Sequence, residues 1–361
     1  MSTRLSVRRA LSSLEGRRAE RGGNREEPEL VLVGLSGGAD SLALAAALAA
    51  EAASARLRAG AIVVDHALQH GSAEVAERAA AAARGLGLDP VLVRRVAVDG
   101  SSGGPEAAAR SARYTAFAEA AADASAIAIL TAHTRDDQAE QVLLALARGS
   151  GSRSIAGIPP LRELAPPAGR TPRDQGDPAA LNSPMNGALM LRPFLGGDPE
   201  ITRAVTEAAC AELGLEPWRD PHNADPAYAR VRVRDELLPA LERALGPGVA
   251  AGLARSADLA REDADALEDW ADEVIRSEVG GEAVSIAVET LAMLPAAVRQ
   301  RVIHRIAGRG FGAALSRDHT LAIAALVTDW RGQGPTHVPG VVVTRSGGAL
   351  VFERQPGSPR E

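Results

Sequence analysis

The first 150 residues alternate between short apolar runs and longer runs with a helical period, which predicts strands and helices in turn. The apolar runs predict strands at 30–35, 61–65, 91–96 and 126–131. The periodic runs predict helices at 42–55, 73–86, 106–122 and 136–148. Apolar strands that alternate with helices are typical of a parallel sheet covered on both faces. The predicted fold class is therefore α/β, with a Rossmann-like, doubly wound parallel sheet.

The rest of the chain follows a different pattern. Residues 159–187 are rich in Pro, Gly and Asn and lack periodicity, so we expect a long mobile loop there. Helical periodicity returns at 200–213 and dominates again from residue 240, which predicts a smaller, mostly helical domain. Alternation on both sides of a Ser-Gly-Gly turn predicts a terminal β-hairpin at 338–352. We expect an N-terminal extension (1–27), an α/β domain (28–239) and a helical domain with the hairpin (240–361).

A glycine loop joins the first predicted strand to the first predicted helix. It reads Ser36-Gly-Gly-Ala-Asp-Ser41. A strand, a glycine turn and a helix in this order direct backbone N–H groups and the positive end of the helix at an anion. Asp40 suits such a loop if Mg²⁺ lies between its carboxylate and a phosphate, which predicts Asp40 as a metal ligand. The alternative is that Asp40 only caps the helix, a common use of Asp.

The absence of lysine narrows the type of loop. All 40 basic residues of the chain are arginines. A Walker-type loop requires a lysine on the phosphates and a GxxxxGK[ST] spacing, and the chain has neither. A catalytic Schiff-base lysine is excluded for the same reason. The loop also lacks the GxGxxG spacing, so a dinucleotide-binding fingerprint is not supported.

Polar residues follow three of the predicted strands. Asp40, Asp65 and His133 each come shortly after a strand, and ligands of such sheets bind at the carboxyl ends of the strands. Asp136 and Asp137 fall at the start of a predicted helix, where the helix dipole stabilises negative charge. Adjacent carboxylates beside a histidine suit an ammonium group, Mg²⁺ or proton removal from an amine. The alternative for Asp137 is a capping box with the residue three positions earlier.

The composition of the chain excludes several further classes of protein. The 361 residues are 46% hydrophobic and include one cysteine, Cys210, which excludes internal disulfides, a CxxC pair and a cysteine-built zinc site. No run approaches the ~20 apolar residues of a membrane span, and the N-terminus lacks an apolar signal region, so we expect a cytoplasmic protein. The net charge of −6 disfavours nucleic acid, but arginines cluster locally, as at 219–234 and 299–309. Two interpretations of these arginines are open: they form a basic face opposite the acidic run 262–278, or they are scattered, solvated side chains.

Several short blocks occur in one order along nearly the whole chain. They are Ser36-Gly-Gly-x-Asp-Ser41, Asp65-His66-x-Leu68, Ala109-Arg110-x-x-Arg113-Tyr114, His133-x-x-Asp136-Asp137-Gln-Ala-Glu140, Arg192-Pro-Phe-Leu195, Asp220-Pro-His-Asn223 with Arg230-x-x-x-Arg234, and Asp329-Trp-Arg-Gly-Gln-Gly334. In this order they resemble the tRNA(Ile)-lysidine synthetase family of N-type ATP pyrophosphatases, the PP-loop enzymes. The resemblance implies an adenine nucleotide alpha hydrolase-like α/β domain and a C-terminal tRNA-binding domain.

The resemblance also implies an activity. Enzymes of this family are ligases that use ATP to adenylate the C2 oxygen of the wobble cytidine in the CAU anticodon of tRNA(Ile). The ε-amine of free L-lysine then attacks C2, and the products are lysidine, AMP and pyrophosphate. The implied cofactors are ATP and Mg²⁺, and the implied partners are tRNA(Ile) and L-lysine. A homodimer is an open alternative to a monomer.

Site roles follow from the resemblance block by block. Catalysis is assigned to Asp40, Arg113, His133, Asp136 and Asp137. ATP binding is assigned to Ser36, Gly37, Gly38, Ala39, Asp40, Ser41, Asp65 and His66. Contacts to tRNA are assigned to Arg192, Asn223, Arg230 and Arg234, and the C-terminal arginine cluster adds Arg301 and Arg305.

Within this scheme, the loop holds the pyrophosphate group and Asp40 holds Mg²⁺. His133 lies near the α-phosphate, and Arg113 stabilises charge on the phosphoryl group or the cytidine. Asp136 and Asp137 receive the lysine ammonium, and one of them acts as the base. For Arg110 and Arg113, one helical turn apart, a solvated or salt-bridged helix face is the alternative.

Two other classes remain open on sequence grounds. One is another PP-loop ATP pyrophosphatase, such as a tRNA thiolase or an amidotransferase-type synthetase, although thiolases usually need more cysteines than Cys210 provides. The other is a non-catalytic nucleotide- or RNA-binding protein, which would be expected to lose Asp40 or the 136–137 carboxylates. Two positions depart from the family pattern, with Gln69 in place of a usual Arg and Val231 in place of a usual Asn.

Overall fold

The computed structural model describes residues 1–20, 28–67, 71–97, 105–149, 151–164, 188–279 and 284–355. The chain divides into two compact units, one of residues 1–170 and 186–261 and the other of residues 171–185 and 262–361. Residue 240, where the sequence pattern places a boundary, lies in α9 (Leu238–Leu245), and helix α10 (Val249–Glu278) runs through the point at which the two units divide. Among the described residues, no helix is long and apolar enough to cross a membrane.

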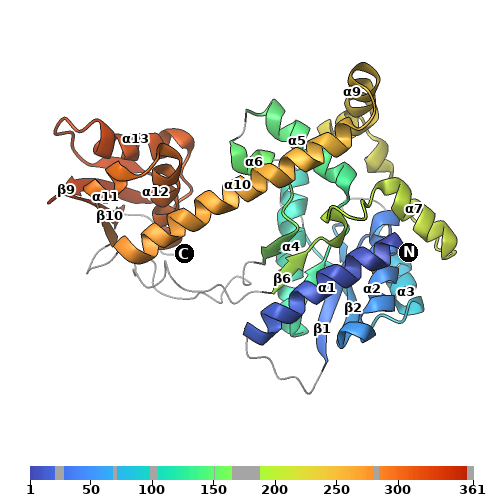
Figure 1. The fold of residues 1–361 in the computed structure, drawn as a ribbon. Helices are drawn as coiled ribbons and strands as arrows, with labels where there is room; N and C mark the ends of the chain where they lie inside the picture. The colour runs from blue at the N-terminus through green and yellow to red at the C-terminus, as the bar shows by residue number, and fades with distance from the viewer. Residues whose placement is uncertain are drawn as a thin grey trace. The chain divides into compact units, whose positions relative to one another are not determined.

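The first unit is built on a six-stranded sheet with the order β3-β2-β1-β4-β6-β5 (Figure 1). Strands β1 to β6 span Glu29–Leu35, Leu57–Asp65, Val91–Arg95, Ala126–Leu130, Leu161–Glu163 and Leu189–Leu191. All neighbouring strands are parallel except β5, which runs antiparallel to β6. The predicted α/β class with a parallel sheet is confirmed.

The segment expected as a loop at 159–187 contains one of these strands. Residues 161–163 form β5 because they pair in register with β6 at the edge of the sheet. Three residues are too few for an alternation pattern to reveal a strand. The remainder of the expected loop, residues 165–187, lies outside the described residues.

Helices cover both faces of this sheet. Helices α1 to α7 span Ser2–Glu20, Ala39–Glu51, Ser72–Gly85, Pro105–Asp123, Arg135–Ala147, Ser152–Ile155 and Arg203–Glu212. Short turns and helices follow or intervene: η1 (Ala53–Ala55), η3 (Pro193–Leu195), η4 (Pro221–Ala224), α8 (Ala229–Arg232), the π-turn η5 (Val233–Leu237) and α9 (Leu238–Leu245). Helices α1, α2, α3 and α7 share a core with one face, and α4 packs on the other.

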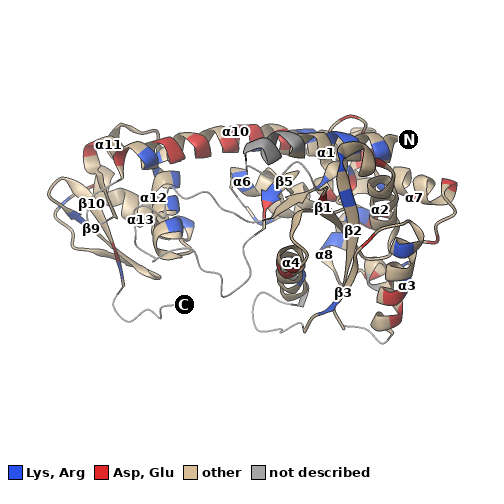
Figure 2. Cartoon of the chain, turned by 90° about the horizontal axis from the view of Figure 1, so that it is seen from below, with Lys and Arg blue, Asp and Glu red and all other residues tan. Residues whose placement is uncertain are grey.

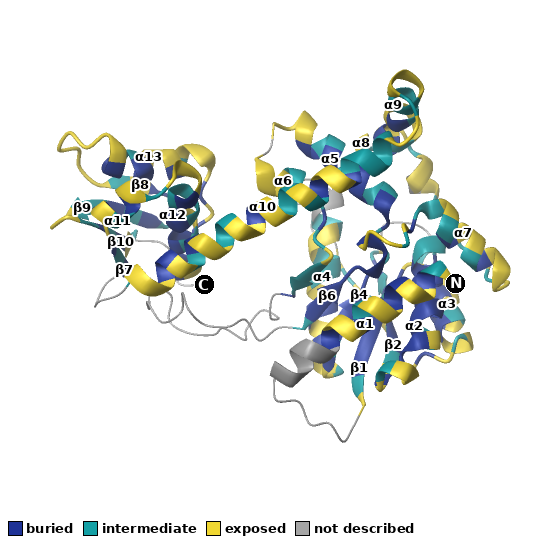
Figure 3. Cartoon of the chain, in the orientation of Figure 1, coloured by how far each residue is buried: buried dark blue, intermediate teal, exposed yellow. Residues whose placement is uncertain are grey.

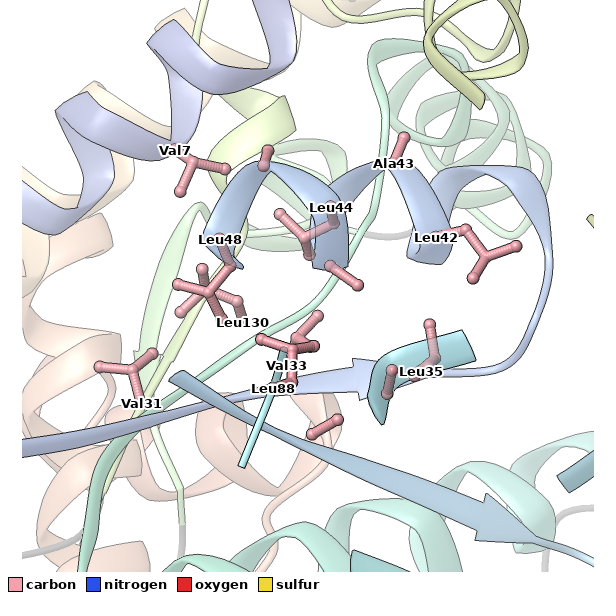
Figure 4. Close-up of a cluster of buried hydrophobic side chains, with 14 of the residues drawn as sticks. Val7, Val31, Val33, Leu35, Leu42, Ala43, Leu44, Leu48, Leu88 and Leu130 are labelled. Atoms are coloured by element: carbon pink, nitrogen blue, oxygen red, sulfur yellow. The ribbon is translucent and has the colours of Figure 1, made fainter. Parts of the chain in front are cut away.

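Small aliphatic side chains make the core between α2 and the sheet. Leu44 and Leu48 of α2 point toward Val31 and Val33 of β1, and all four are at most 2% exposed (Figure 4). On the opposite face, β1 passes so close to α4 that a Cβ atom on Gly34 would lie 2.8 Å from the ring of Phe117. The alternating residues of β1 therefore face two cores, as expected for a strand in a doubly covered sheet.

The N-terminal helix α1 is part of this unit rather than a loose extension. Val7, Leu11 and Leu14 are buried in the core shared with α2, while the other side of α1 is exposed (Figure 3). The buried carboxylate of Glu51, at the end of α2, accepts hydrogen bonds from Arg4 Nε at 2.6 Å and Arg8 Nε at 2.7 Å. These bonds hold the pKa of Glu51 below its ordinary value.

The second unit combines helices with a small antiparallel sheet. Its elements after α10 are β7 (Val284–Ala287), α11 (Val288–Met293), α12 (Ala296–Phe311), α13 (Arg317–Thr328), β8 (Thr336–Val338), β9 (Val341–Ser346) and β10 (Ala349–Arg354). The predicted terminal hairpin is β9–β10, and it forms the centre of a sheet with the order β7-β10-β9-β8. The core of this unit is aliphatic, with Phe311 and Phe352 as its aromatic members.

The pairing of α1 with Glu51 allows a test of what holds the N-terminus. The double change Arg4→Ala/Arg8→Ala leaves the buried carboxylate without these two partners, so we expect the free energy of unfolding to fall at pH 7. Adding Glu51→Leu removes the buried charge, and we expect it to recover most of that loss. Urea unfolding of the three proteins measures both effects, and an equal or larger loss in the triple variant would contradict the role assigned to the buried charge.

Candidate active site

The glycine loop lies between the end of β1 at Leu35 and the start of α2 at Ala39. Gly37 has a φ of +83°, in the left-handed region that favours glycine. Its carbonyl accepts a 2.9 Å hydrogen bond from the N–H of Trp218, which fixes the turn. Among the side chains that the structure describes, none caps the N-terminus of α2 at Gly38. Because the first N–H groups of a helix have no partner within it, this turn is suited to bind an anion.

The two serines of the loop play different parts. Ser41 is buried, and its hydroxyl donates to the Gly38 carbonyl at 3.0 Å and accepts from the Ser36 N–H at 3.2 Å. Ser36 is exposed at the loop surface, and its hydroxyl lies 3.1 Å from that of Ser41. Ser41 therefore shapes the turn, while the hydroxyl of Ser36 remains accessible to a ligand.

Asp40 is half-buried in the first turn of α2, and the hydroxyl of Thr206 in α7 donates a hydrogen bond to its Oδ1. Burial raises the pKa of Asp40 to about 6, and the negative charges of Asp136 and Asp137 act in the same direction. Thr206 and Arg203 oppose the shift. Asp40 is thus ionised at neutral pH, but its charge is costly in the absence of a cation.

A second group of carboxylates lies at the N-terminus of α5. Thr134 is the N-cap of this helix, and its N–H donates to Asp137 Oδ2 at 2.7 Å, which confirms the capping-box interpretation. The other oxygen of Asp137 accepts from Arg230 at 2.7 Å. Asp136 Oδ2 accepts from the backbone N–H of Arg203 at 2.7 Å. Both adjacent carboxylates are therefore oriented by specific donors.

Two arginines hold these carboxylates together with a third, Glu140. Arg230 donates through Nε to Glu140 Oε2 at 2.6 Å, and Arg203 lies 3.7 Å from both Asp137 and Glu140. Burial by itself raises the pKa of Asp137, but Arg230 and His133 outweigh it and leave that pKa below the ordinary value. For Glu140 burial dominates, and its pKa is raised. The group therefore places Asp137, whose charge is stabilised, next to Glu140, whose charge is destabilised by burial.

The histidines near the carboxyl ends of the strands are held neutral. His133, after β4, lies with Nδ1 3.2 Å from the hydroxyl of Thr131. Burial lowers its pKa well below the ordinary value, and Arg192 and Arg113 add to the effect, so the ring is uncharged at neutral pH. Burial and Arg113 likewise lower the pKa of His66, after β2.

Asp65 at the end of β2 mainly organises the adjacent backbone. Its Oδ1 accepts from the N–H of Ala67 at 2.9 Å, and Arg95 lies 3.9 Å from Oδ2. Burial alone raises its pKa, but hydrogen bonds from Ser72 and Ala67 and the charge of Arg95 bring it below the ordinary value. Strands β2, β1 and β4 are neighbours, so Asp65, the glycine loop and His133 share one edge, as the sequence predicted.

The arginines assigned to tRNA occupy different environments. Arg192 is 2% exposed and donates to the carbonyl of Pro159 at 2.5 Å. Arg230 binds the carboxylates of α5, and the departure at Val231 is a buried side chain. Arg234 pairs with Asp235 at 2.7 Å and donates to the backbone carbonyl of Asn223. Gln69 lies outside the described residues.

In the second unit, Arg305 of α12 pairs with Asp272 at 2.6 Å and Glu268 at 2.7 Å, both on α10. Arg301 donates to the carbonyl of Ala297 at 3.0 Å. The basic side of α12 thus meets the acidic side of α10 (Figure 2). These ion pairs compensate much of the positive charge that the arginine cluster at 299–309 suggested.

Sequence reasoning did not assign Thr206 and Arg203 to the site. They lie one helical turn apart on α7, so both reach the same region. The helix itself was predicted at 200–213, but a lone threonine and arginine carry no recognisable spacing toward residues far away in the chain. Glu140 stood inside a recognised block, yet its pairing with Arg230 joins residues 90 positions apart.

Comparison with known protein families agrees with the geometry of the site. The family described as "PP-loop domain" matches residues 11–241, and the "TilS substrate binding domain" matches residues 287–351. The fold and the uncapped glycine loop therefore define this chain as a PP-loop ATP-binding protein.

Similar curated proteins narrow this class. The tRNA(Ile)-lysidine synthase of Leifsonia xyli subsp. xyli is 54% identical over 90% of this chain and 89% of its own length. Those of Salinispora tropica and Thermobifida fusca are 52% and 48% identical, over 90% and 93% of this chain and 90% and 92% of their own lengths. The chain belongs to the tRNA(Ile)-lysidine synthase family.

The raised pKa of Asp40 has a measurable effect on stability. The unfolded chain has an ordinary Asp pKa near 3.9, so between about pH 4 and 6 the native protein binds more protons than the unfolded one. Stability therefore falls as pH rises through this range and remains reduced above it. We expect Asp40→Asn to increase the free energy of unfolding by about 1–3 kcal/mol at pH 8, and by much less near pH 4.

Urea unfolding at the two pH values, without nucleotide or Mg²⁺, measures this difference. Asp123→Asn is a suitable control because Asp123 is exposed and pairs with Arg94 at the surface. Equal stability of wild type and Asp40→Asn at pH 8 would show that the charge of Asp40 carries no such cost.

Proposed function

We propose that this chain catalyses the reaction of its family, the ATP-dependent formation of lysidine on tRNA(Ile) with a CAU anticodon, with L-lysine as the second substrate. The observation that carries the proposal is the link made by α7 between the nucleotide loop and the carboxylates of α5. Thr206 binds Asp40, and the backbone of Arg203 binds Asp136. One helix thus connects the loop that suits ATP with the group that suits an amine. Because the proposed substrates, free tRNA and ATP, are found in the cytoplasm, we place the proposed reaction there.

The loop residues Ser36 to Ser41 would hold the β- and γ-phosphates, which leave as pyrophosphate. Asp40 is the residue that would hold Mg²⁺, and the cost of its charge supports this role, because a cation relieves it. Among the described residues, no group of three or more His, Cys, Asp or Glu side chains forms a metal site by itself. Mg²⁺ would therefore be shared between Asp40 and the phosphates, which it would neutralise when bound.

His133 and Arg113 are assigned to the α-phosphate and the cytidine. The low pKa of His133 keeps the imidazole neutral, so it would serve as a hydrogen-bond donor to phosphoryl oxygens without competing for protons. Arg113 is half-buried, and this burial lowers the pKa of its guanidinium. A desolvated cation interacts strongly with charge that develops in the transition state.

Asp136 and Asp137 would receive the ammonium group of lysine. Both oxygens of Asp137 are engaged, one in the cap of α5 and one with Arg230. Asp136 commits only Oδ2 to a partner among the described residues. We therefore assign Asp136 as the base that removes a proton from the ε-ammonium, because the amine must be neutral to attack C2. Asp137 would add attraction for the cation.

The contacts assigned to tRNA remain part of the proposal. Asn223 is exposed, and the half-buried Arg234 donates to its backbone carbonyl, which supports a shared contact there. On α12 both Arg301 and Arg305 stay in the proposal, and Arg305 would have to exchange its pairs with Asp272 and Glu268 for a contact with tRNA. Arg192 and Arg230 would act from the interior, beside the reacting groups.

The direct test is incorporation of labelled L-lysine into an unmodified tRNA(Ile) transcript with a CAU anticodon, in the presence of ATP and Mg²⁺. We expect ATP-dependent incorporation by the wild type and at least a 100-fold loss in Asp40→Ala, because the loop loses its only carboxylate. A tRNA(Ile) transcript with a GAU anticodon is the control substrate. Pyrophosphate release without incorporation of lysine would be consistent with an ATP pyrophosphatase activity, but it would refute lysidine formation on tRNA(Ile).

Thr206 provides a second test, with a matched control on the same residue. Thr206→Val keeps the shape of this buried side chain but removes the donor to Asp40, so we expect the Mg²⁺ concentration for half-maximal rate to rise and kcat to fall about 10-fold. Thr206→Ser keeps the hydroxyl and should remain within about 2-fold of the wild type. Equal rates for the two variants would exclude a positioning role for this hydroxyl.

A further inference from the structure

Tyr114 of α4 is the centre of a cluster of arginines beside the proposed active site. The guanidinium carbons of Arg162, Arg110 and Arg113 lie 4.7, 5.0 and 6.0 Å from the centre of its ring. The hydroxyl of Tyr114 is 3.4 Å from a terminal nitrogen of Arg192. We call these five residues the Tyr114 cluster. Four cations therefore converge on one aromatic side chain.

The arginines of the Tyr114 cluster have no carboxylate partner among the described residues. Arg192 donates to the Pro159 carbonyl and to Met190 Sδ, and its Nε is buried with no hydrogen-bond partner in the described part of the chain. Arg162 donates only to the backbone carbonyl of Glu163, at 3.4 Å. Within the described ranges, no carboxylate forms the salt bridges considered as an alternative for Arg110 and Arg113. Cations that are brought together and partly removed from water without counter-charge create a site for an anion.

The aromatic ring explains how these cations are kept in place. Arg110, Arg113 and Tyr114 occupy one face of α4, and Arg162 reaches the ring from β5. Cation–π contacts hold the guanidinium groups while their N–H donors remain available. Burial by itself raises the pKa of Tyr114, but Arg110 and Arg192 outweigh it and lower the pKa, consistent with strong positive potential at this point.

The Tyr114 cluster and the nucleotide loop belong to different faces of the sheet. The loop leads into α2, which packs on the face shared with α1 and α3, whereas α4 packs on the opposite face. Along the sheet, β4 and β6 separate β1 from β5, so the strands that carry the loop and Arg162 are about 14 Å apart. Arg162 therefore lies on a strand away from the loop and is not needed by a pyrophosphate held there, whereas a chain of phosphates extends to both.

We propose that the Tyr114 cluster is a phosphodiester site that grips the backbone of the substrate RNA beside the nucleotide that is modified, with Arg162 and Arg110 as its outer donors and Arg192 as its buried support. The proposal rests on the function proposed above, in that the RNA is taken to be the substrate. Guanidinium groups are suited to this ligand because they bind phosphate oxygens in pairs.

The test measures RNA binding without catalysis. Fluorescence anisotropy with a labelled tRNA(Ile) transcript, without ATP, gives Kd over a series of salt concentrations for wild type, Arg162→Gln and Arg94→Gln. Arg94 is the control because it is an exposed arginine on β3, at the other edge of the same sheet, paired with Asp123 at 2.9 Å. We expect Arg162→Gln to raise Kd about 5- to 10-fold and to reduce the slope of log K against log salt by about 0.7–0.9. Arg94→Gln should leave both unchanged.

Several outcomes would overturn the proposal. Unchanged RNA affinity in Arg162→Gln, with a raised KM for ATP, would assign the cluster to the nucleotide. Equal weakening by Arg94→Gln would indicate a general effect of surface charge. Tyr114→Phe keeps the ring and should bind RNA as the wild type does, whereas Tyr114→Leu should weaken binding about as much as Arg162→Gln. Equal weakening by both Tyr114 variants would refute the supporting role of the ring, and thermal unfolding of every variant checks the fold.

The RNA-binding test and the lysine-incorporation test can refute their two proposals independently of each other. If wild type binds the tRNA with an Arg162-dependent affinity but incorporates no lysine, the RNA site stands and lysidine formation is refuted. If lysine is incorporated but the RNA affinity does not depend on Arg162, lysidine formation stands and the phosphodiester site is refuted.

Discussion

The sharing of two carboxylates, Asp137 and Glu140, by two arginines is the interaction on which the candidate site depends. Glu140 of α5 is fully buried and Asp137 is half-buried, and a carboxylate removed from water destabilises a fold unless it is paired and hydrogen-bonded. Arg230 and Arg203 supply the partners from two different helices. The three helices are thereby fixed relative to one another, and Thr206 on α7 reaches the carboxylate of Asp40. The geometry of the nucleotide loop thus depends on ion pairs outside it.

Charge in the first unit is arranged in two opposite ways around the same sheet edge. At α5 the negative charges are in close contact with arginines, which keep the pKa of Asp137 below its ordinary value and the carboxylate ionised. At Tyr114 the positive charges have no acidic partner among the described residues, and an aromatic ring supports them instead. In the second unit, by contrast, the charge of Arg305 is compensated in the usual way, by ion pairs with two carboxylates. The contrast distinguishes arginines that hold the fold together from those that remain available to a ligand.

Local patterns predicted the fold well because their physical causes are local. The period of apolar residues identified the strands that became β1 to β4, and the Thr134–Asp137 spacing identified a capping box that the structure contains. The contact between Thr206 and Asp40 joins residues 166 positions apart, and nothing near either residue indicates the other. Strand β5 was missed because its pairing with β6 defines it, rather than its own pattern. The charge of Arg305 was visible in the sequence, but its neutralisation by α10 depends on how the two helices pack.

Helix α1 shows that the region matched to the PP-loop family is not the same as the part of the chain that folds together. The match to the PP-loop family begins at residue 11, in the middle of α1, whereas the contacts of α1 with α2 begin earlier, at Arg4 and Val7. A protein that started at residue 11 would keep every recognised motif, yet it would lose half of a core helix. The carboxylate of Glu51 would then face no cation, at the far end of the helix whose first turn forms the nucleotide loop. For this chain, the physical start of the ATP-binding domain is its first helix, not its first motif.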